Sequence, residues 1–159
     1  MVLIVDLVLL VGVGLALQAA ERPGPVKGRV VFVCEHGAAK SVVAAAHFNR
    51  LAAERGLPYL AVAKGTDPQQ ALSPTAVDGL RSDGLEAAAA TPERVKVEDL
   101  ASAARVVSFG CDLSKIAPAG KRIERWDETP PVGENYAAAR TAILERVKGL
   151  LDELAKEKR

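Results

Sequence analysis

Three residues in one short stretch combine the groups needed to attack and hold a tetrahedral oxyanion. Cys34 supplies a thiol, and Lys40 and Ser41 follow it after five small or polar residues, Glu35, His36, Gly37, Ala38 and Ala39. A thiolate is a nucleophile, a cation neutralises the oxygens of the anion, and a hydroxyl can hydrogen-bond the sulfur. The order predicts a site in which Cys34 is the nucleophile, Lys40 is the anion clamp and the five residues between them form an oxyanion-binding loop.

The elements on either side of this loop must place the thiol. Residues 29–34 are mostly β-branched or aromatic and predict a strand, and residues 41–55 carry apolar residues at helical spacing. A strand, a tight loop and a helix start form an anion cradle, because the loop amides and the first-turn N–H groups point at one spot. The field that binds an anion there also stabilises a thiolate.

The remaining elements predict an α/β fold. Further strands are expected at residues 59–63, 105–109 and 121–126, and further helices are expected from Ser73-Pro74 to near Gly84, at 97–103 and at 135–156. Strands that alternate with helices indicate a single four-stranded parallel sheet, doubly wound and flanked by helices. Ligands of such sheets bind beyond the carboxyl ends of the strands, where the Cys34 loop lies.

Composition narrows the classes of function. A chain of 159 residues that is 49% hydrophobic is long enough for one domain with a real core. Lys and Arg number 21 against 20 Asp and Glu, which gives no support for a nucleic-acid partner. Two cysteines are too few for a disulfide scaffold or a structural zinc site, and His36 and His47 lack metal-ligand spacing. No metal is therefore predicted.

The first twenty residues differ from the rest. Residues 7–17 form an unbroken apolar run, the length of a signal-peptide core, although no Lys or Arg precedes it. We therefore expect residues 1–20 to be a signal peptide or membrane anchor, residues 21–27 a linker, and residues 28–157 the functional domain. Export to the periplasm or membrane anchoring follows. The cations after the run favour a cytoplasmic domain if the anchor is retained. A buried extra strand and a wrongly assigned start codon are the alternatives.

The chain resembles the low-molecular-weight protein tyrosine phosphatases and the related thioredoxin-coupled arsenate reductases from about Gly28 to Lys156. The stretches that carry the likeness are Val31-Phe-Val-Cys34 with its loop, Lys64-Gly65-Thr66, Val106-Val107-Ser108, Trp126-Asp127 and the closing helix. The resemblance implies a cysteinyl-phosphate or cysteinyl-arsenate intermediate without a metal or other cofactor. It implies a phosphorylated protein or a small phosphate or arsenate ion as the partner, with thioredoxin only if the protein is a reductase.

Two departures from the family pattern affect the chemistry. The family loop ends in Arg-Ser or Arg-Thr, and Lys40 replaces the planar two-pronged guanidinium with a mobile point charge. A single oxyanion donor is worth about 3–4 kcal/mol in the transition state. The family acid is an Asp that follows Trp-Asp, and here Pro130 takes its place. Asp127 is the candidate acid, with Glu128 and the loop residue His36 as alternatives.

The second cysteine allows a redox function. Cys111 follows the third strand, next to the first strand in the implied fold, so that a Cys34–Cys111 disulfide is possible if their Cα atoms lie within about 7 Å. The alternative is a small buried thiol. For Trp126 and Tyr136, a place at the substrate entrance and a place in the core are equally compatible with the sequence, whereas His47 is expected to be a packing or surface residue.

Three functions stay open on the sequence. The first is hydrolysis of phosphate monoesters through a Cys34 thiophosphate intermediate, which the intact nucleophile and Ser41 favour. The second is arsenate reduction by Cys34 and Cys111. The third is a catalytically silent module that binds an oxyanion or a phosphoprotein, which the replaced Arg and Asp favour.

Overall fold

The four strands form one parallel sheet. The computed structural model describes residues 25–157, and the sheet order is β2-β1-β3-β4. The strands are β1 (Gly28–Cys34), β2 (Tyr59–Gly65), β3 (Arg105–Ser108) and β4 (Ile123–Arg125). The helices are α1 (Lys40–Glu54), α2 (Pro74–Ser82), α3 (Val97–Ser102) and α4 (Tyr136–Glu157). The prediction of a single four-stranded parallel sheet is confirmed.

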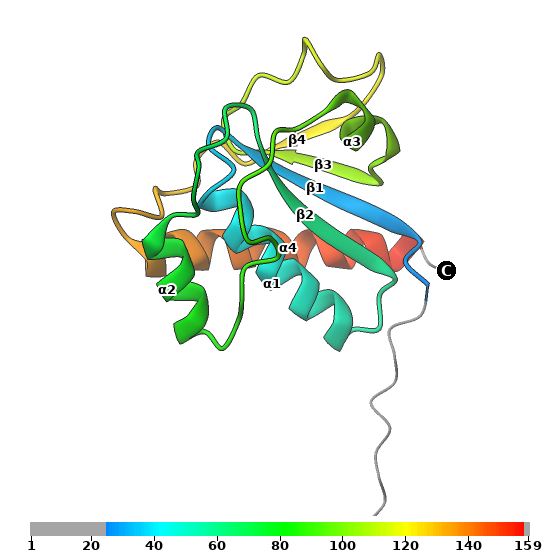
Figure 1. Ribbon diagram of the computed structural model, residues 1–159. Helices are drawn as coiled ribbons and strands as arrows, with labels where there is room; N and C mark the ends of the chain where they lie inside the picture. Colours follow the sequence, from blue (N-terminus) through cyan, green and yellow to red (C-terminus); the bar gives the residue numbers. More distant parts are fainter. Residues whose placement is uncertain (1–24, 158–159) are drawn as a thin grey trace, which may run out of the picture.

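The helices cover both faces of the sheet, as a doubly wound fold requires (Figure 1). Val30 and Phe32 of β1 point into a core formed with α1 and α4. The alternate residues Val31 and Val33 point to the opposite face, where Leu100 of α3 is buried. This alternation follows from the period of two in a strand, and it explains why β1 is apolar throughout: both of its faces are covered.

The helices match the sequence pattern closely. Six apolar residues that lie at helical spacing on α4 are all buried: Ala139, Ile143, Val147, Leu150, Leu151 and Leu154. The Ser73 side chain accepts a hydrogen bond from the Ala76 amide, so Ser73 caps α2 as its position before Pro74 predicts.

The fourth strand is shorter than predicted. It begins at Ile123 and not at Lys121, because the Lys121 amide bonds back to the Pro118 carbonyl in a turn. Its partner is β3, in a register that pairs Ser108 with Arg125. The ladder continues for one more bond, from the Trp126 amide to the Ser108 carbonyl at 2.8 Å.

The strand register gathers the functional loops at one edge of the sheet. Cys34 at the end of β1 pairs with Gly65 at the end of β2, and Val33 pairs with Ser108 at the end of β3. The starts of α1, α2 and α4 lie toward the same side, on the left of Figure 1. Three loops and three helix N-termini therefore surround Cys34.

The predicted signal peptide or anchor, residues 1–20, lies outside the described residues, as does most of the predicted linker. Between residues 25 and 157, no helix is both long and apolar enough to cross a membrane.

Candidate active site

The loop after β1 is held by its carbonyl groups. The carbonyls of residues 34, 35, 36 and 38 accept hydrogen bonds of 2.7 to 3.2 Å from amides of the segment after β2, those of Thr66, Asp67, Gln69 and Ser73. Within residues 25–157, no amide of loop residues 35–39 donates to a protein partner. The loop is thus held by its carbonyls while the N–H groups of residues 35–39 are left without a protein acceptor, the arrangement expected of a backbone nest that binds an anion.

Two glycines permit this arrangement. Gly37 has a φ of +60°, and a Cβ built on it would lie 2.8 Å from the Gly65 amide nitrogen. A Cβ on Gly65 would lie 2.7 Å from the Gly37 amide nitrogen. The two backbones are thus pressed together without room for a side chain on either, and this contact sets the curvature of the loop.

Cys34 and Ser41 lie together at the bottom of the loop. The Cys34 Sγ is 3.1 Å from the Ser41 Oγ, although seven residues separate them in sequence. Ser41 is fully buried, and the Cys34 side chain faces the cavity described below. The Ser41 hydroxyl can donate a hydrogen bond to the sulfur, the role that the sequence predicts for it.

Helix α1 begins at the nest and carries Lys40 in its first turn. The N-cap residue, Ala39, makes no side-chain hydrogen bond, and the first turn contains no acidic residue. The first amides of the helix thus have no side-chain acceptor and are available to an anion. Lys40 lines the cavity and, within the described part of the chain, has no ion pair or hydrogen-bond partner from its side chain. Its charge is therefore uncompensated at the site.

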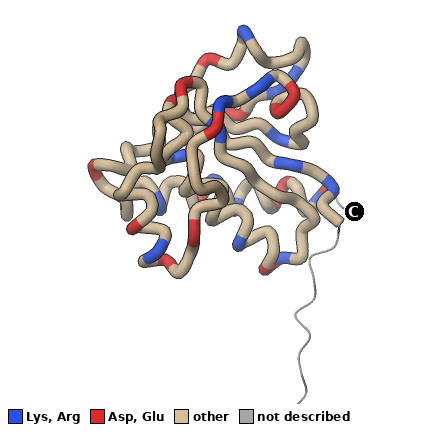
Figure 2. Tube along the Cα trace, in the orientation of Figure 1, with Lys and Arg blue, Asp and Glu red and all other residues tan. Residues whose placement is uncertain are grey.

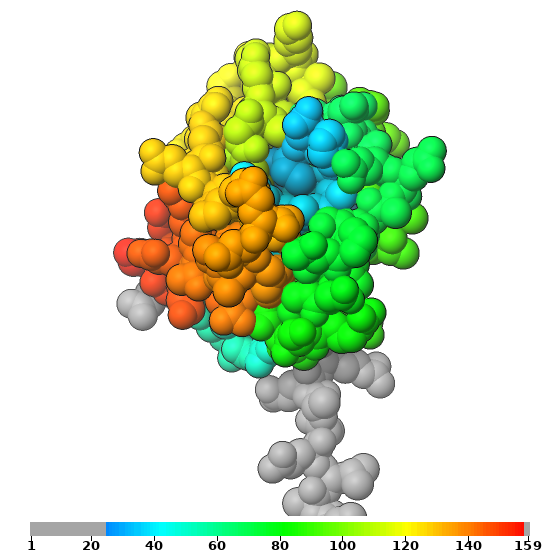
Figure 3. All heavy atoms as spheres, turned by 90° about the vertical axis from the view of Figure 1, so that its left-hand side faces the viewer, coloured from blue at the N-terminus to red at the C-terminus, as the bar shows by residue number. Residues whose placement is uncertain are grey.

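A cavity of about 350 Å³ opens above Cys34. The loop and Lys40 form its floor, and its walls come from Gln69 and Ser73 on one side and from Phe109 and residues 131–133 on the other. In Figure 3 the blue loop lies recessed between the green segment that leads to α2 and the orange segment that leads to α4. The volume is in the range of small-molecule sites and accommodates a phosphate with an aromatic group attached.

The structure places the predicted acid Asp127 away from this lining. One Asp127 oxygen accepts from the Gly110 amide at 3.0 Å, and the other from the Arg125 Nε at 2.8 Å. Residues 131–133, which form the wall beyond Pro130, have no ionisable side chain. The ionisable side chains that line the cavity are those of Cys34, Glu35, His36 and Lys40.

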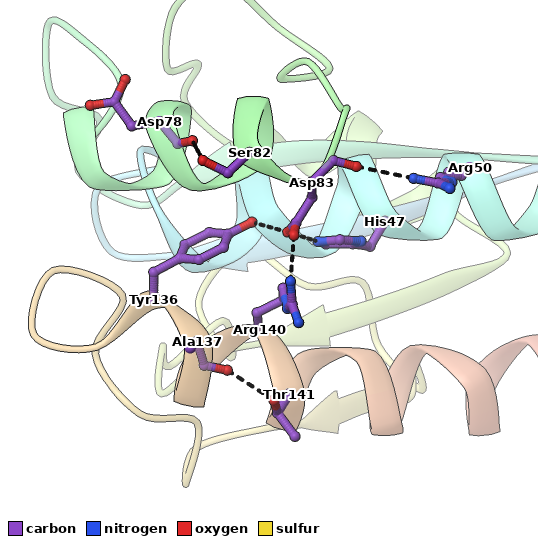
Figure 4. Close-up of polar contacts among 9 residues, drawn as sticks. All are labelled: His47, Arg50, Asp78, Ser82, Asp83, Tyr136, Ala137, Arg140 and Thr141. Carbon is purple, nitrogen blue, oxygen red and sulfur yellow. Dashed lines mark hydrogen bonds and ion pairs between the residues drawn. The ribbon is translucent and has the colours of Figure 1, made fainter.

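Of the two positions that the sequence left open for Trp126 and Tyr136, the structure shows the core, since neither lines the cavity. Trp126 is almost fully buried, with its ring 5.5 Å from that of Phe32 and its Nε1 donating to the Glu124 carboxylate at 2.7 Å. Tyr136 packs against the core, and its hydroxyl is directed at Asp83 (Figure 4). The apolar wall comes instead from Phe109 and Val132, which sequence reasoning did not single out because neither belongs to a chemical motif.

Cys111 lies near Cys34 but faces a different cavity. Both thiols are free, and Cys111 borders a separate cavity beside the loop that leads to β4. The Cys111 Sγ is 3.9 Å from the Thr66 Oγ1, and the Thr66 amide bonds the Cys34 carbonyl. Burial raises the pKa of the Cys111 thiol above its ordinary value, although the Thr66 contact opposes this shift. Cys111 is thus a protonated, buried thiol, and Thr66 contacts both its sulfur and the Cys34 backbone.

A partly buried carboxylate ties the helices around the site together (Figure 4). Asp83, just after α2, accepts a hydrogen bond of 2.6 Å from the Tyr136 hydroxyl and another from Arg140, both on α4. The Arg50 guanidinium of α1 donates to the Asp83 carbonyl at 3.2 Å. The His47 Nε2 lies 3.3 Å from the same carboxylate without hydrogen-bond geometry. Burial lowers the pKa of His47, so this ring is neutral near pH 7 and the contact is no ion pair.

This network fixes the wall of the cavity. Tyr136 follows residues 131–133 by three positions, and a Cβ on Gly79 of α2 would lie 2.3 Å from its ring. Helix α4 is thereby held against α2 and α1, and the wall that precedes α4 is held with it. No sequence pattern predicts this network, because Asp83 lies in an ordinary helix-terminating Asp-Gly pair.

Charges elsewhere are paired or dispersed. Lys64 pairs with Glu93 at 2.5 Å and does not line the cavity. Figure 2 shows basic and acidic residues interspersed along the trace. The uncompensated cation at the site is therefore that of Lys40.

Fold and site together define a class of protein: a small parallel α/β domain with a cysteine at the end of the first strand, next to a loop whose amides have no protein acceptor in the described part of the chain. The sequence profile of the family "Low molecular weight phosphotyrosine protein phosphatase" matches residues 29–159. The chain belongs to this family, whose members include cysteine-based phosphatases and arsenate reductases. Comparison with curated protein sequences returned no match.

Solved structures of both activities share the fold. A thioredoxin-dependent arsenate reductase of Corynebacterium glutamicum matches with a TM-score of 0.68 and 22% identity over 84% of this chain, which spans 64% of that reductase. An arsenate reductase of Archaeoglobus fulgidus has a TM-score of 0.63 and 30% identity, covering 77% of this chain and 98% of its own. A low molecular weight phosphotyrosine phosphatase of Vibrio cholerae has a TM-score of 0.72 and 17% identity, covering 82% of this chain and 98% of its own.

Proposed function

We propose that the protein is a cysteine-dependent phosphatase that hydrolyses aryl phosphate monoesters, such as a phosphotyrosine residue of a protein, through a Cys34 thiophosphate intermediate. The observation that carries the proposal is the pairing of Cys34 with Ser41 at a loop that lines the cavity and whose amides, at residues 35–39, have no protein acceptor in the described part of the chain. The apolar wall of Phe109 and Val132 suits an aromatic leaving group.

Each group then has a defined task. The Cys34 thiolate attacks phosphorus, and the bond from phosphorus to the ester oxygen breaks. The free amides of residues 35–39 and the first turn of α1 hold the three remaining oxygens, while Lys40 offsets their charge. Ser41 donates to the sulfur and so stabilises it as the leaving group when water attacks the intermediate.

The lysine sets the expected rate. An ammonium group can bond one oxygen at a time along a given direction, whereas a guanidinium bonds two in a fixed plane. We expect Lys40→Arg to raise kcat by roughly tenfold or more, because one additional charge-assisted hydrogen bond is worth about 1.5–3 kcal/mol.

Arsenate reduction is the second candidate, and the observation that favours it is the link from Cys111 through Thr66 to the Cys34 backbone. In this chemistry Cys34 attacks arsenate, and Cys111 then attacks the Cys34 sulfur. The two thiols become a disulfide, arsenic is reduced by two electrons and leaves as arsenite, and a thioredoxin-type dithiol restores the thiols. The separate cavity of Cys111 and its protonated state weigh against this order of events.

One set of assays separates the candidates. Hydrolysis of p-nitrophenyl phosphate and thioredoxin-coupled turnover of arsenate are measured for the wild type, Cys34→Ser, Lys40→Arg and Cys111→Ser. Phosphatase activity that disappears in Cys34→Ser, rises in Lys40→Arg and survives in Cys111→Ser supports the proposal. Arsenate turnover that disappears in Cys111→Ser supports the reductase. If neither turnover occurs and inorganic phosphate still raises the melting temperature, the protein is the silent binding module.

A further inference from the structure

The cavity has no acid on the wall that would face a leaving group. Transfer of the phosphoryl group to Cys34 leaves an alkoxide or phenolate, which needs a proton unless it is already a good leaving group. Asp127 is bonded to Gly110 and Arg125. Glu128, the other acid considered from the sequence, does not line the cavity, and residues 131–133 have no ionisable side chain. The proton must then come from a group of the loop or directly from water.

We infer that His36 is the acid that protonates the leaving group, an inference that rests on the proposed phosphatase function. His36 lines the cavity two residues after the nucleophile. Its Nδ1 lies 3.2 Å from the Asp67 carbonyl oxygen. A carbonyl can only accept, so Nδ1 carries a hydrogen and donates it. The nitrogen that gains and loses the second proton is therefore Nε2.

The surroundings leave Nε2 free to act. The nearest acidic atom is the Glu35 Oε2 at 3.9 Å, and the two side chains are 45% and 73% exposed for His36 and Glu35 respectively. An ion pair as exposed as this contributes only about 0–1 kcal/mol, so a leaving oxygen can replace it as the partner of Nε2. The Asp67 bond meanwhile fixes the ring, because the Asp67 amide is itself bonded to the Glu35 carbonyl at 2.7 Å.

The proton balance of the two steps is closed. In the first, Cys34 Sγ bonds to phosphorus, the bond to the ester oxygen breaks, and the Nε2 proton moves to that oxygen. In the second, water attacks phosphorus, Nε2 takes a proton from the water, and the bond between phosphorus and sulfur breaks. His36 ends protonated and Cys34 ends as a thiolate, so no other reactant is required.

The inference predicts a dependence on the leaving group. The measured quantity is the rate at which the leaving phenol is released as Cys34 is phosphorylated. This rate is compared for phenyl phosphate, whose leaving group needs a proton, and for 2,4-dinitrophenyl phosphate, whose leaving group does not. The test variant is His36→Asn, whose side-chain amide can keep the bond to the Asp67 carbonyl but has no acid at the Nε2 position. We expect the ratio of the phenyl to the dinitrophenyl rate to fall by about 100-fold, the lower range for general acid catalysis.

Two controls isolate the effect from misfolding and from Glu35. Glu35→Gln is expected to change both rates by the same factor. In His36→Ala, added imidazole is expected to restore phenyl phosphate turnover without accelerating that of the dinitrophenyl ester. An unchanged ratio in His36→Asn, or a ratio that falls in Glu35→Gln, would overturn the assignment of His36 while leaving the phosphatase proposal intact. Absence of Cys34-dependent turnover of both esters would overturn the phosphatase proposal and the assignment with it.

Discussion

The contact between Gly37 and Gly65 leads to the sharpest prediction. In Gly65→Ala, the new methyl group would lie 2.7 Å from the Gly37 nitrogen, 2.9 Å from the His36 carbonyl carbon and 3.0 Å from the Gly37 Cα. All three are backbone atoms of the anion-binding loop, so no side-chain rotation relieves the clash. The loop must move away from β2, and the hydrogen bonds from Thr66 and Asp67 to its carbonyls must lengthen.

The expected cost follows from this geometry. Overpacking of one methyl group against backbone costs about 1–3 kcal/mol in the free energy of unfolding. The matched control is Gly149→Ala on α4, where a Cβ would meet nothing within 4 Å and φ is not positive. Because alanine favours a helix over glycine, this control should stabilise the protein by about 0.5–1 kcal/mol. The same chemical change is thus expected to have opposite signs at the two positions.

Urea unfolding and a phosphate titration test both consequences. The displaced loop should bind inorganic phosphate at least tenfold more weakly, which removes about 1.4 kcal/mol of the stabilisation that a saturating concentration gives the wild type. The melting temperature is therefore recorded with and without phosphate for both variants. If Gly65→Ala unfolds at the wild-type urea concentration and keeps the full phosphate effect, the close contact of the two backbones does not shape the anion site.

Four further outcomes are expected. Tyr136→Phe should lower the free energy of unfolding by about 1.5 kcal/mol, measured in urea, because it removes a hydrogen bond to the Asp83 carboxylate. Although burial alone raises the pKa of Asp83, the hydrogen bonds from Tyr136 and Arg140 hold that pKa below 3.8. The stability that the ionised Asp83 contributes is therefore lost as the pH falls through its folded pKa. We expect Asp83→Asn to flatten the acid limb of the curve of unfolding free energy against pH. Burial lowers the pKa of His47 below 6.5, so the unfolded chain binds a proton at this residue more readily than the folded chain does. The free energy of unfolding should therefore rise with pH up to about 6.5, and His47→Gln should abolish that rise. Calorimetry at several pH values measures this slope. Because burial raises the pKa of Cys111, iodoacetamide should alkylate this thiol in Cys34→Ser only slowly at pH 8 and faster above pH 9. Mass spectrometry follows the alkylation. Rapid reaction at pH 8 would contradict a buried, protonated thiol.

The sequence alone determined the fold and the centre of the site. Strand and helix patterns with regular alternation specify a parallel doubly wound sheet, because each pattern follows from local periodicity and burial on one or two faces. The order of Cys34, five short residues, Lys40 and Ser41 predicts a nucleophile in an anion-binding loop, because that arrangement is local in sequence. The structure then placed Ser41 3.1 Å from the sulfur.

The tertiary structure decided what surrounds the nucleophile. Residues from three loops meet over Cys34 only when the strand ends align, so the wall of Phe109 and Val132 and the contact of Gly37 with Gly65 have no local signature. The same holds for the Asp83 network, whose partners lie 53 and 57 residues away. The direction of a side chain also cannot be predicted from the spacing of residues in the sequence. Asp127 follows Trp126 as the family pattern requires, yet its carboxylate oxygens accept hydrogen bonds from Gly110 and Arg125, because the nearest donors in the fold lie there.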